Sequence, residues 1–333
     1  MIRSIYRDSQ GQTTETLTAE GWANALKDPA GLLWVDIVAE PADQVQALLT
    51  QTFALHPAIV RRLVQTGSPP RGNDLGSHIY TVVHSLVIGP SMVVGDVAFD
   101  PQTQQLTTYA LDLILGKNFL VTYHQSAQVP SDGIWAQLHE APDALASGAA
   151  CLFYRVIEIL ISGYLAVLSC LGDTIETMEN SVLSQHLAAE QQATIAIRRA
   201  LLELGRILRP QAEALDKLAR EGRAEDYEEA RGYLREAYSD MAHASELVST
   251  LRDRMDGVIN VNLAVASNRV NEIVKVLTLF TVLFLPITFL TGFFGMNFPF
   301  LPVQQPVLFV GTLALMVVCP VGMWLWFWRR GWL

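Results

Sequence analysis

Two long apolar runs near the end of the chain constrain its fold more than any other feature. They span residues 274–294 and 307–328, and no Asp, Glu, Lys or Arg occurs from Thr278 to Phe327. Each run is close to the ~20 residues that a helix needs to cross a hydrocarbon layer of about 30 Å. Two such helices in tandem are hard to bury in a mostly polar chain without lipid. The sequence therefore predicts a transmembrane hairpin.

The positions of positive charge predict how this hairpin is oriented. Lys275 stands at the start of the first run, and Arg329 and Arg330 follow the second. The positive-inside rule then places both ends on the cytoplasmic side. Residues 1–17 contain no apolar stretch long enough for a signal peptide. We therefore expect a multi-pass protein of the inner membrane, with its N-terminal domain and its C-terminus in the cytoplasm.

The composition argues against several classes of function. The net charge is −10, whereas a nucleic-acid-binding protein is expected to carry a basic face, so we expect no nucleic-acid partner. The cysteines form no CxxC pair, which argues against a disulfide framework or a zinc knuckle. No Gly-rich phosphate loop, nucleophile elbow or HExxH helix is present. We therefore expect neither an enzyme nor a resident cofactor.

Three histidines fall on or beside the predicted strands, at His78, His84 and His124. They would be metal ligands if the fold gathered them at one point. Because no cysteine or tightly spaced carboxylate accompanies them, we favour the alternative that they are surface or hydrogen-bonded core histidines.

Residues 1–150 are predicted to form a cytoplasmic α/β domain. The segment LLWVDI from Leu32 to Ile37, bounded by Gly31 and Pro41, is predicted to be a buried strand. Helices are predicted at 41–53 and 56–65, a loop at 67–76, and further strands at 77–88, 94–100, 105–115 and 119–124. The order of these strands in the sheet does not follow from the sequence.

The remaining chain is predicted to be helical. Residues 151–223 form a cytoplasmic helical hairpin, with Pro210 as a kink or break in its second helix. Residues 224–294 form a stalk helix that continues into the first transmembrane helix, roughly 100 Å in all at 1.5 Å per residue. The other segments are an outer loop at 295–306, the second transmembrane helix at 307–328 and a basic cytoplasmic tail at 329–333.

One face of the stalk helix carries uncharged polar residues into the first membrane span. Steps of four and three residues bring together Asn260, Ala264, Ser267, Asn271, Val274, Thr278, Thr281, Leu285, Thr288 and Gly292. Two interpretations compete. Small and hydroxyl residues allow membrane helices to pack closely, with Thr bonding back to its own helix. Alternatively, the face lines an aqueous path, because polar groups at membrane depth tend to line cavities.

We favour the aqueous path because the polar positions run through the whole span. A single chain supplies only one such face, so several copies are needed to enclose a pore. Val274 and Leu285 would then interrupt the polar rings with apolar rings, which are expected to gate by dewetting.

The first span begins NEIVKVLT at Asn271, contains FLPITF, and is followed by the tripeptide Gly295-Met296-Asn297. These motifs resemble those of the CorA-type divalent-cation transporters, a superfamily that includes a zinc-transporting branch. The chain also contains Trp34-Val35-Asp36, His56-Pro57, LGKNFLVT at 115–122 and a terminal RRGWL. A lone GMN tripeptide would be weak evidence. Its position after the first of two C-terminal spans, with the other motifs in order, makes the resemblance specific along nearly the whole chain.

The resemblance implies a funnel-shaped homopentamer in the lipid bilayer that transports divalent metal ions. First-span helices would line the pore, with Gly295, Met296 and Asn297 at its outer mouth. The side-chain carbonyl of Asn297 would hold a hydrated ion through its water shell, and Asn271 would form a second ring. Gly295 is expected to give the turn its backbone freedom. Magnesium-type members are also inhibited by cytoplasmic divalent ions at carboxylates, and one such position corresponds to Glu236, for which a solvent-facing glutamate is an equal alternative.

The sequence departs from the family pattern in its outer loop. Residues 298–306 contain no acidic residue, whereas magnesium-type members usually carry some there, and Phe294 stands where Tyr is frequent. Electrostatic concentration of cations at the mouth should therefore be weaker. The transported ion stays open between Mg²⁺, Co²⁺ or Ni²⁺ and Zn²⁺, and passage stays open between passive and proton-linked. A different class of function is a membrane-anchored metal sensor or scaffold that does not conduct.

Overall fold

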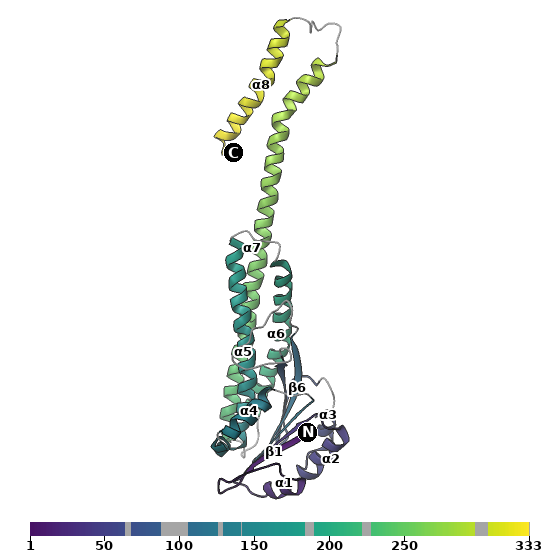
Figure 1. Cartoon of the computed structure of the whole chain (residues 1–333), viewed down its shortest axis with the longest axis vertical. Coiled ribbons are helices and arrows are strands. Elements are labelled where there is room, and N and C mark those ends of the chain that lie inside the picture. Colours follow the sequence, from purple (N-terminus) through teal and green to yellow (C-terminus); the bar gives the residue numbers. More distant parts are fainter. Residues whose placement is uncertain are drawn as a thin grey trace. The chain divides into compact units, whose positions relative to one another are not determined.

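The structure is a computed structural model that consists of two compact units (Figure 1). Unit 1 is Met1–Ile259 and unit 2 is Asn260–Leu333. The helix α7, Glu228–Phe294, contributes residues to both units. The described residues are 1–63, 68–87, 106–125, 129–140, 142–183, 190–221, 228–296 and 306–332.

A seven-stranded sheet lies at the centre of unit 1, in the order β2-β1-β3-β7-β6-β5-β4. Only β3 and β7 pair in parallel, and every other neighbouring pair among these strands is antiparallel. The strands are β1 Ile2–Arg7, β2 Thr13–Glu15, β3 Leu32–Val38, β4 Arg71–Asp74, β5 Ile79–Val87, β6 Thr107–Leu115 and β7 Phe119–His124.

The predicted strands at 32–37, 77–88, 105–115 and 119–124 are confirmed as β3, β5, β6 and β7. The strand predicted at 94–100 lies outside the described residues. The prediction of a loop at 67–76 is wrong for Arg71–Asp74, which form β4. The physical reason lies in Gly72. A Cβ on Gly72 would lie 2.6 Å from the carbonyl oxygen of Ala214, so a residue with a side chain would not fit this close approach of β4 to the helix α6, Glu190–Glu221. The glycine that suggests a loop in the sequence is what admits a strand here.

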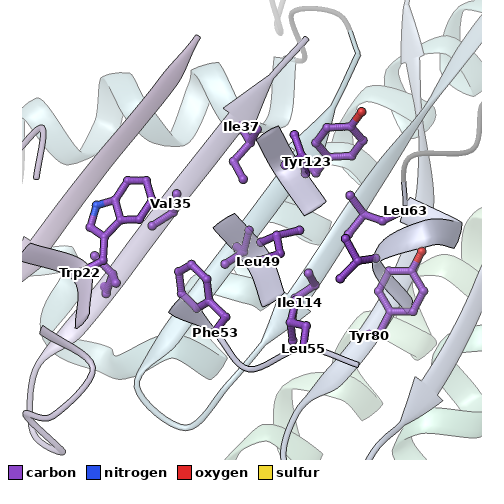
Figure 2. Close-up of a cluster of buried hydrophobic side chains, with 14 of the residues drawn as sticks. Trp22, Val35, Ile37, Leu49, Phe53, Leu55, Leu63, Tyr80, Ile114 and Tyr123 are labelled. Carbon is purple, nitrogen blue, oxygen red and sulfur yellow. The ribbon is translucent and has the colours of Figure 1, made fainter. Parts of the chain in front are cut away.

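One face of the sheet carries an apolar core beneath three helices, α1 Ala19–Ala25, α2 Ala42–Thr52 and α3 Pro57–Leu63 (Figure 2). Alternation along β3 directs Leu33, Val35 and Ile37 to this face. The helices contribute, among others, Trp22, Val45, Leu49, Phe53, Val60 and Leu63. The side chains of β3 are buried on both of its sides, because its other face is also covered.

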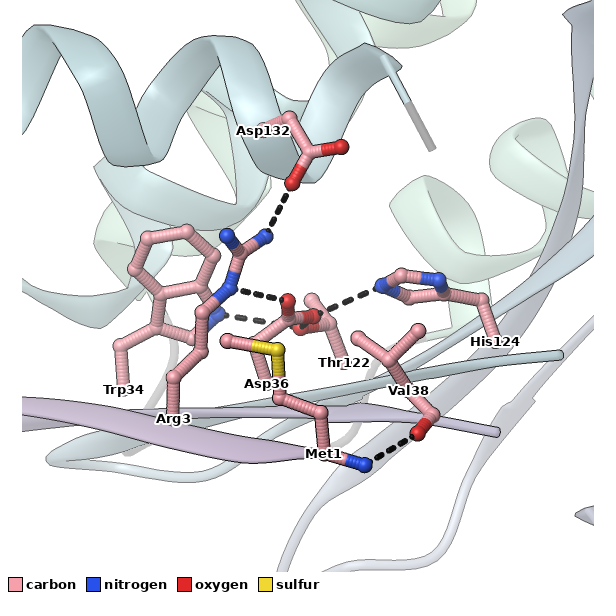
Figure 3. Close-up of polar contacts among 8 residues, drawn as sticks. All are labelled: Met1, Arg3, Trp34, Asp36, Val38, Thr122, His124 and Asp132. Carbon is pink, nitrogen blue, oxygen red and sulfur yellow. Dashed lines mark hydrogen bonds and ion pairs between the residues drawn. The ribbon is translucent and has the colours of Figure 1, made fainter. Parts of the chain in front are cut away.

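A buried polar network lies on the opposite face of the sheet, centred on Asp36 (Figure 3). The Asp36 carboxylate accepts hydrogen bonds from Arg3 Nε at 2.8 Å and from the Thr122 hydroxyl, and contacts His124 Nε2 at 3.0 Å. Burial by itself raises the pKa of Asp36, but these partners outweigh burial and hold that pKa below its usual range. Arg3 also pairs with Asp132 of α4 (Val129–Glu140), so the network ties β1, β3 and β7 to that helix.

A second buried carboxyl, Asp112 on β6, gives a prediction for the pH dependence of stability. Tyr80 donates its hydroxyl to Asp112 at 2.6 Å, yet burial raises the pKa of Asp112 to about 7. The folded protein thus keeps a proton that the unfolded chain releases near 3.8, so stability falls as pH rises through this window. Asp112→Asn stays neutral and still offers an oxygen to Tyr80. The wild type loses stability as the pH rises, and we expect the variant to avoid about 2 kcal/mol of that loss. This corresponds to roughly 4–8 °C in the unfolding midpoint.

The measurement is the thermal midpoint of the purified chain between pH 4 and pH 8, followed by tryptophan fluorescence. The matched control is Asp43→Asn on α2, which removes an exposed carboxylate and should keep the wild-type pH profile. Equal profiles for Asp112→Asn and the wild type would show that Asp112 does not titrate in this range.

Two long helices, α5 Gly148–Leu183 and α6 Glu190–Glu221, complete unit 1 together with the first part of α7. The break allowed for at Pro210 is wrong, since α6 continues through it. Arg254 of α7 forms two hydrogen bonds with Glu179 of α5, at 3.1 and 2.7 Å. Tyr233 of α7 stacks on Tyr154 of α5 with ring centroids 5.5 Å apart. These contacts hold the start of α7 against α5.

Among the described residues, three helices are long and apolar enough to cross a membrane. The first, within Leu145–Ser181, has 56% of its apolar window buried inside the structure, whereas α7 has 6% and α8 (Pro306–Arg329) has 0%. The apolar residues of α5 are therefore largely used in the core of unit 1. The apolar residues of α7 and α8 are exposed in the single chain and need another apolar environment, such as a lipid bilayer, to cover them.

Candidate functional site

The polar face predicted from the sequence lies on α7. All nine residues predicted to line the pore are exposed there. These positions are Asn260, Ser267, Asn271, Val274, Thr278, Thr281, Leu285, Thr288 and Gly292, all in unit 2. Because α7 is continuous as far as Phe294, the helical spacing that brings these residues to one face holds along the whole set.

The threonines of this face bond back to their own helix. The hydroxyls of Thr278, Thr281 and Thr288 donate to the carbonyl oxygens four residues earlier, at 2.8, 2.9 and 3.0 Å. This is the geometry that the packing interpretation expects. It also has a chemical consequence, because a hydroxyl that has donated its hydrogen has only acceptor lone pairs left. The face therefore offers neutral oxygen acceptors.

The less exposed positions of α7 lie on a different face of the same helix. In the membrane segment they include Leu279, Leu283, Pro286, Leu290 and Phe294. At 100° per residue, this set is centred roughly 180° from the polar face. The helix is therefore partly covered on one side, and the polar face lies opposite it on the exposed part of its surface.

The covered side of α7 faces α8 within unit 2. A cavity of about 250 Å³ near the ends of these helices is lined by Thr291 and Phe294 of α7 together with residues of α8. The less exposed positions of α8 recur on one face, at Leu308, Thr312, Met316, Cys319, Met323 and Phe327. Thr291 stands beside the predicted set but turns toward α8, which the sequence spacing alone did not separate from the polar face.

Part of the predicted outer mouth is described. Gly295 and Met296 continue from α7 through hydrogen bonds to Thr291 O at 3.0 Å and Phe293 O at 3.3 Å. Asn297 and the loop that follows lie outside the described residues. Gly295 has no positive φ, and a Cβ there would lie 3.0 Å from the carbonyl oxygen of Thr291, four residues earlier. The backbone freedom expected of Gly295 stays a prediction.

Glu236 lies exposed on α7 in unit 1, beside the tyrosine stack. Burial raises the pKa of Tyr154 to about 12, with a further contribution from the negative charge of Glu236. In the described part of the chain, no three His, Cys, Asp or Glu side chains form a group that would hold a metal ion. A metal bound at Glu236 would thus need ligands from elsewhere.

The three histidines of the α/β domain do not converge on one point. His78 Nδ1 contacts Ser77 Oγ at 2.8 Å, His84 Nε2 contacts Ser68 O at 2.9 Å, and His124 contacts Asp36. Each ring thus has its own hydrogen-bond partner, as the alternative favoured from the sequence expects.

Comparison with known proteins places these features in a family. The family model described as CorA-like Mg²⁺ transporter protein matches residues 29–330. The cobalt/magnesium transport protein CorA of Thermotoga maritima is 26% identical over 313 residues, which cover 92% of this chain and 85% of that protein. The fold of the present chain resembles the complete structure of the CorA magnesium transporter of Methanocaldococcus jannaschii, with a TM-score of 0.75 and 20% identity. The match covers 99% of the present chain and 98% of that chain.

A shorter structure, the ZntB cytoplasmic domain of Vibrio parahaemolyticus, matches with TM-score 0.59 and 15% identity. This match covers 79% of the present chain and 98% of that domain. At such identities, both structural likenesses concern the fold.

Proposed function

Because this chain belongs to the CorA-like Mg²⁺ transporter family, whose members are membrane transporters and not enzymes, we propose that it is a homopentameric pore for divalent cations. In this proposal, α7 and α8 span the inner membrane, and unit 1 and the C-terminus lie in the cytoplasm. Five copies of α7 line the pore, and five copies of α8 surround them.

The observation that carries the proposal is the two-sided character of α7. Its covered side faces α8, and the opposite side presents neutral oxygen acceptors from Thr278, Thr281 and Thr288. An inner ring of helices needs this arrangement, since one face must meet the outer helix while the other meets the pore. A helix that only packed against its neighbours would have no need for a row of outward-facing acceptors through the span.

The chemistry of this face suits hydrated cations. Mg²⁺ takes oxygen ligands and dehydrates reluctantly, so it is best held through its own water shell. The amide oxygens of Asn260 and Asn271 and the threonine hydroxyls accept hydrogen bonds from that water without binding the ion tightly. Val274 and Leu285, both more than half exposed in the single chain, would form apolar rings that close the path when dewetted.

The outer mouth is assigned to Gly295, Met296 and Asn297. A ring of Asn297 carbonyls would capture the incoming ion with its water, and the close approach of Gly295 to Thr291 O would fix where the chain leaves the helix. The cytoplasmic end of the same face would be marked by Asn271.

The cargo we propose is a hydrated ion of the Mg²⁺ and Co²⁺ type, as named for the Thermotoga relative. Zn²⁺ prefers nitrogen and sulfur ligands, and the path offers oxygen only. The decisive experiment compares influx of Mg²⁺, Co²⁺, Ni²⁺ and Zn²⁺ into proteoliposomes, with and without a pH gradient. Preferential Zn²⁺ influx, or influx only with the gradient, would contradict a passive pore of this selectivity.

A non-conducting sensor or scaffold remains the second candidate, favoured by the absence of acidic residues at 298–306. It predicts that correctly assembled protein carries no ion at all in the same assay.

We also propose that Glu236 helps cytoplasmic divalent ions to close the pore, with further ligands from a neighbouring copy. Glu236→Gln keeps a hydrogen-bonding group beside Tyr154 but removes the charge. We expect the Mg²⁺ concentration that half-inhibits flux from the cytoplasmic side to rise about tenfold, equivalent to 1.4 kcal/mol. Glu246→Gln, which neutralises another exposed glutamate on α7, should leave it unchanged. Equal values for all three proteins would make Glu236 an ordinary surface residue.

A further inference from the structure

The end of α8 is a folded turn. Gly331 has a φ of +72°, and its N–H bonds to Trp328 O at 3.1 Å, while the N–H of Trp332 bonds to Phe327 O at 3.1 Å. This pair of bonds is the Schellman arrangement, which needs a left-handed residue and is therefore suited to glycine. The Trp332 ring folds back onto Phe327, with centroids 5.5 Å apart. The segment is thus fixed in place.

Two guanidinium groups project from this turn, those of Arg329 and Arg330. The Arg330 guanidinium lies 5.3 Å from the centre of the Trp326 ring, and Arg329 is exposed beside it. No Asp or Glu occurs in residues 273–333. Among the described residues, neither arginine has an ion pair. Both therefore have charge and donors available for an anion.

The charge of unit 2 is opposite to that of the whole chain. Residues 260–333 contain the basic residues Arg269, Lys275, Arg329 and Arg330 and the single acidic residue Glu272, a net charge of +3 within a chain of net charge −10. The unpaired arginines thus belong to a locally basic unit that ends in apolar helices.

Exposed indole rings surround the two arginines. Trp324, Trp326, Trp328 and Trp332 are between 44% and 61% exposed. Indoles at the end of an apolar helix favour the headgroup level of a bilayer. Arginine matches phosphate with a planar fork of donors, and its stacking on an indole holds that fork in place.

We propose that the turn formed by Trp324–Trp332 binds the phosphate group of an anionic phospholipid. The guanidinium groups of Arg329 and Arg330 contact the phosphate, and the indoles lie against the upper acyl chains. A lipid rather than a free phosphate is favoured because the same turn carries so much exposed aromatic surface. The proposal rests on α8 lying in the membrane, but it does not depend on ion flux.

The test uses the indoles as reporters in the full chain. The protein is placed in nanodiscs that contain equal amounts of phosphatidylglycerol and phosphatidylcholine, with one lipid or the other brominated. Bromine quenches nearby tryptophan, so the ratio of the two quenching curves reports which lipid lies beside the turn. The wild type should favour phosphatidylglycerol by about fivefold for each guanidinium. The double variant Arg329→Gln/Arg330→Gln should show equal quenching by the two lipids.

The control is Arg269→Gln, which removes one positive charge from α7 and should keep the wild-type ratio. The wild type provides a second test, since its preference should weaken between about 0.05 M and about 0.5 M salt. Inorganic phosphate at constant ionic strength should not change the ratio, and a loss of preference would reassign the site to free phosphate. A double variant that keeps the wild-type ratio, or a wild type without preference, would overturn the proposal. If the wild type carried no ions but kept its preference for phosphatidylglycerol in the quenching ratio, only the proposed pore would be refuted.

Discussion

Replacing Asn297 by alanine should lower divalent-cation influx by more than about 100-fold. The proposed mouth loses one carbonyl from each subunit at once, and each hydrogen bond to the hydrated ion contributes of order 1 kcal/mol. The measurement is initial influx of Mg²⁺ and Co²⁺ into proteoliposomes at matched protein content. Assembly should be unchanged, because the substitution adds no bulk.

The control for this result is Gln304→Ala, which removes another side-chain amide from the same outer loop. It should leave influx within about twofold of the wild type, a difference smaller than 0.5 kcal/mol. Wild-type influx in Asn297→Ala would show that the assignment of the mouth is wrong. An equal loss in both variants would point to a general effect on the loop.

The second large effect is expected from the threonines of the polar face. Thr278, Thr281 and Thr288 are replaced together by valine, which keeps the shape of each side chain and removes its oxygen. Three rings of acceptors are lost while the helix keeps its backbone bonds, so the barrier for a hydrated ion should rise. We expect influx to fall by about tenfold or more, equivalent to at least 1.4 kcal/mol.

Thr291 provides a control with the same chemistry on the same helix. Its hydroxyl also bonds back, to Ile287 O at 3.0 Å, but its side chain lines the cavity toward α8. Thr291→Val should therefore keep wild-type influx. If Thr291→Val alone reduced influx as much as the triple variant, the hydroxyls would act through helix stability and not through a pore.

The sequence predicted local structure well where one environment acts on consecutive residues. The β3 segment is buried on both sides because both faces of the sheet are covered, and its boundaries could be read directly. In contrast, β1 and β2 were not predicted. β1 pairs with β3, whose residues lie about thirty positions away, as in the register of Tyr6 with Leu33, and β2 pairs in turn with β1. Pairing across such distances leaves little signal in a local window.

Apolar composition did not by itself separate a membrane helix from a core helix. The windows of α5 and α8 have mean hydropathies of 1.8 and 2.2, which differ little. Their burial differs greatly, because α5 packs against the sheet of unit 1, whereas none of the apolar window of α8 is buried inside the structure. Residues 151–223 were predicted as a cytoplasmic hairpin from their amphipathic pattern, but the extent to which neighbours cover α5 is a property of the fold.

By itself, the sequence determined that the chain ends in two apolar helices, that a neutral polar row runs along the first of them, and that the GMN motif follows. These features depend on helical spacing and on the absence of charge, which can be read residue by residue. Only the tertiary structure decided that the polar row lies opposite the side facing α8 and that Thr291 lines the cavity toward α8. Both depend on which atoms approach from a different helix, and linear spacing does not contain that information.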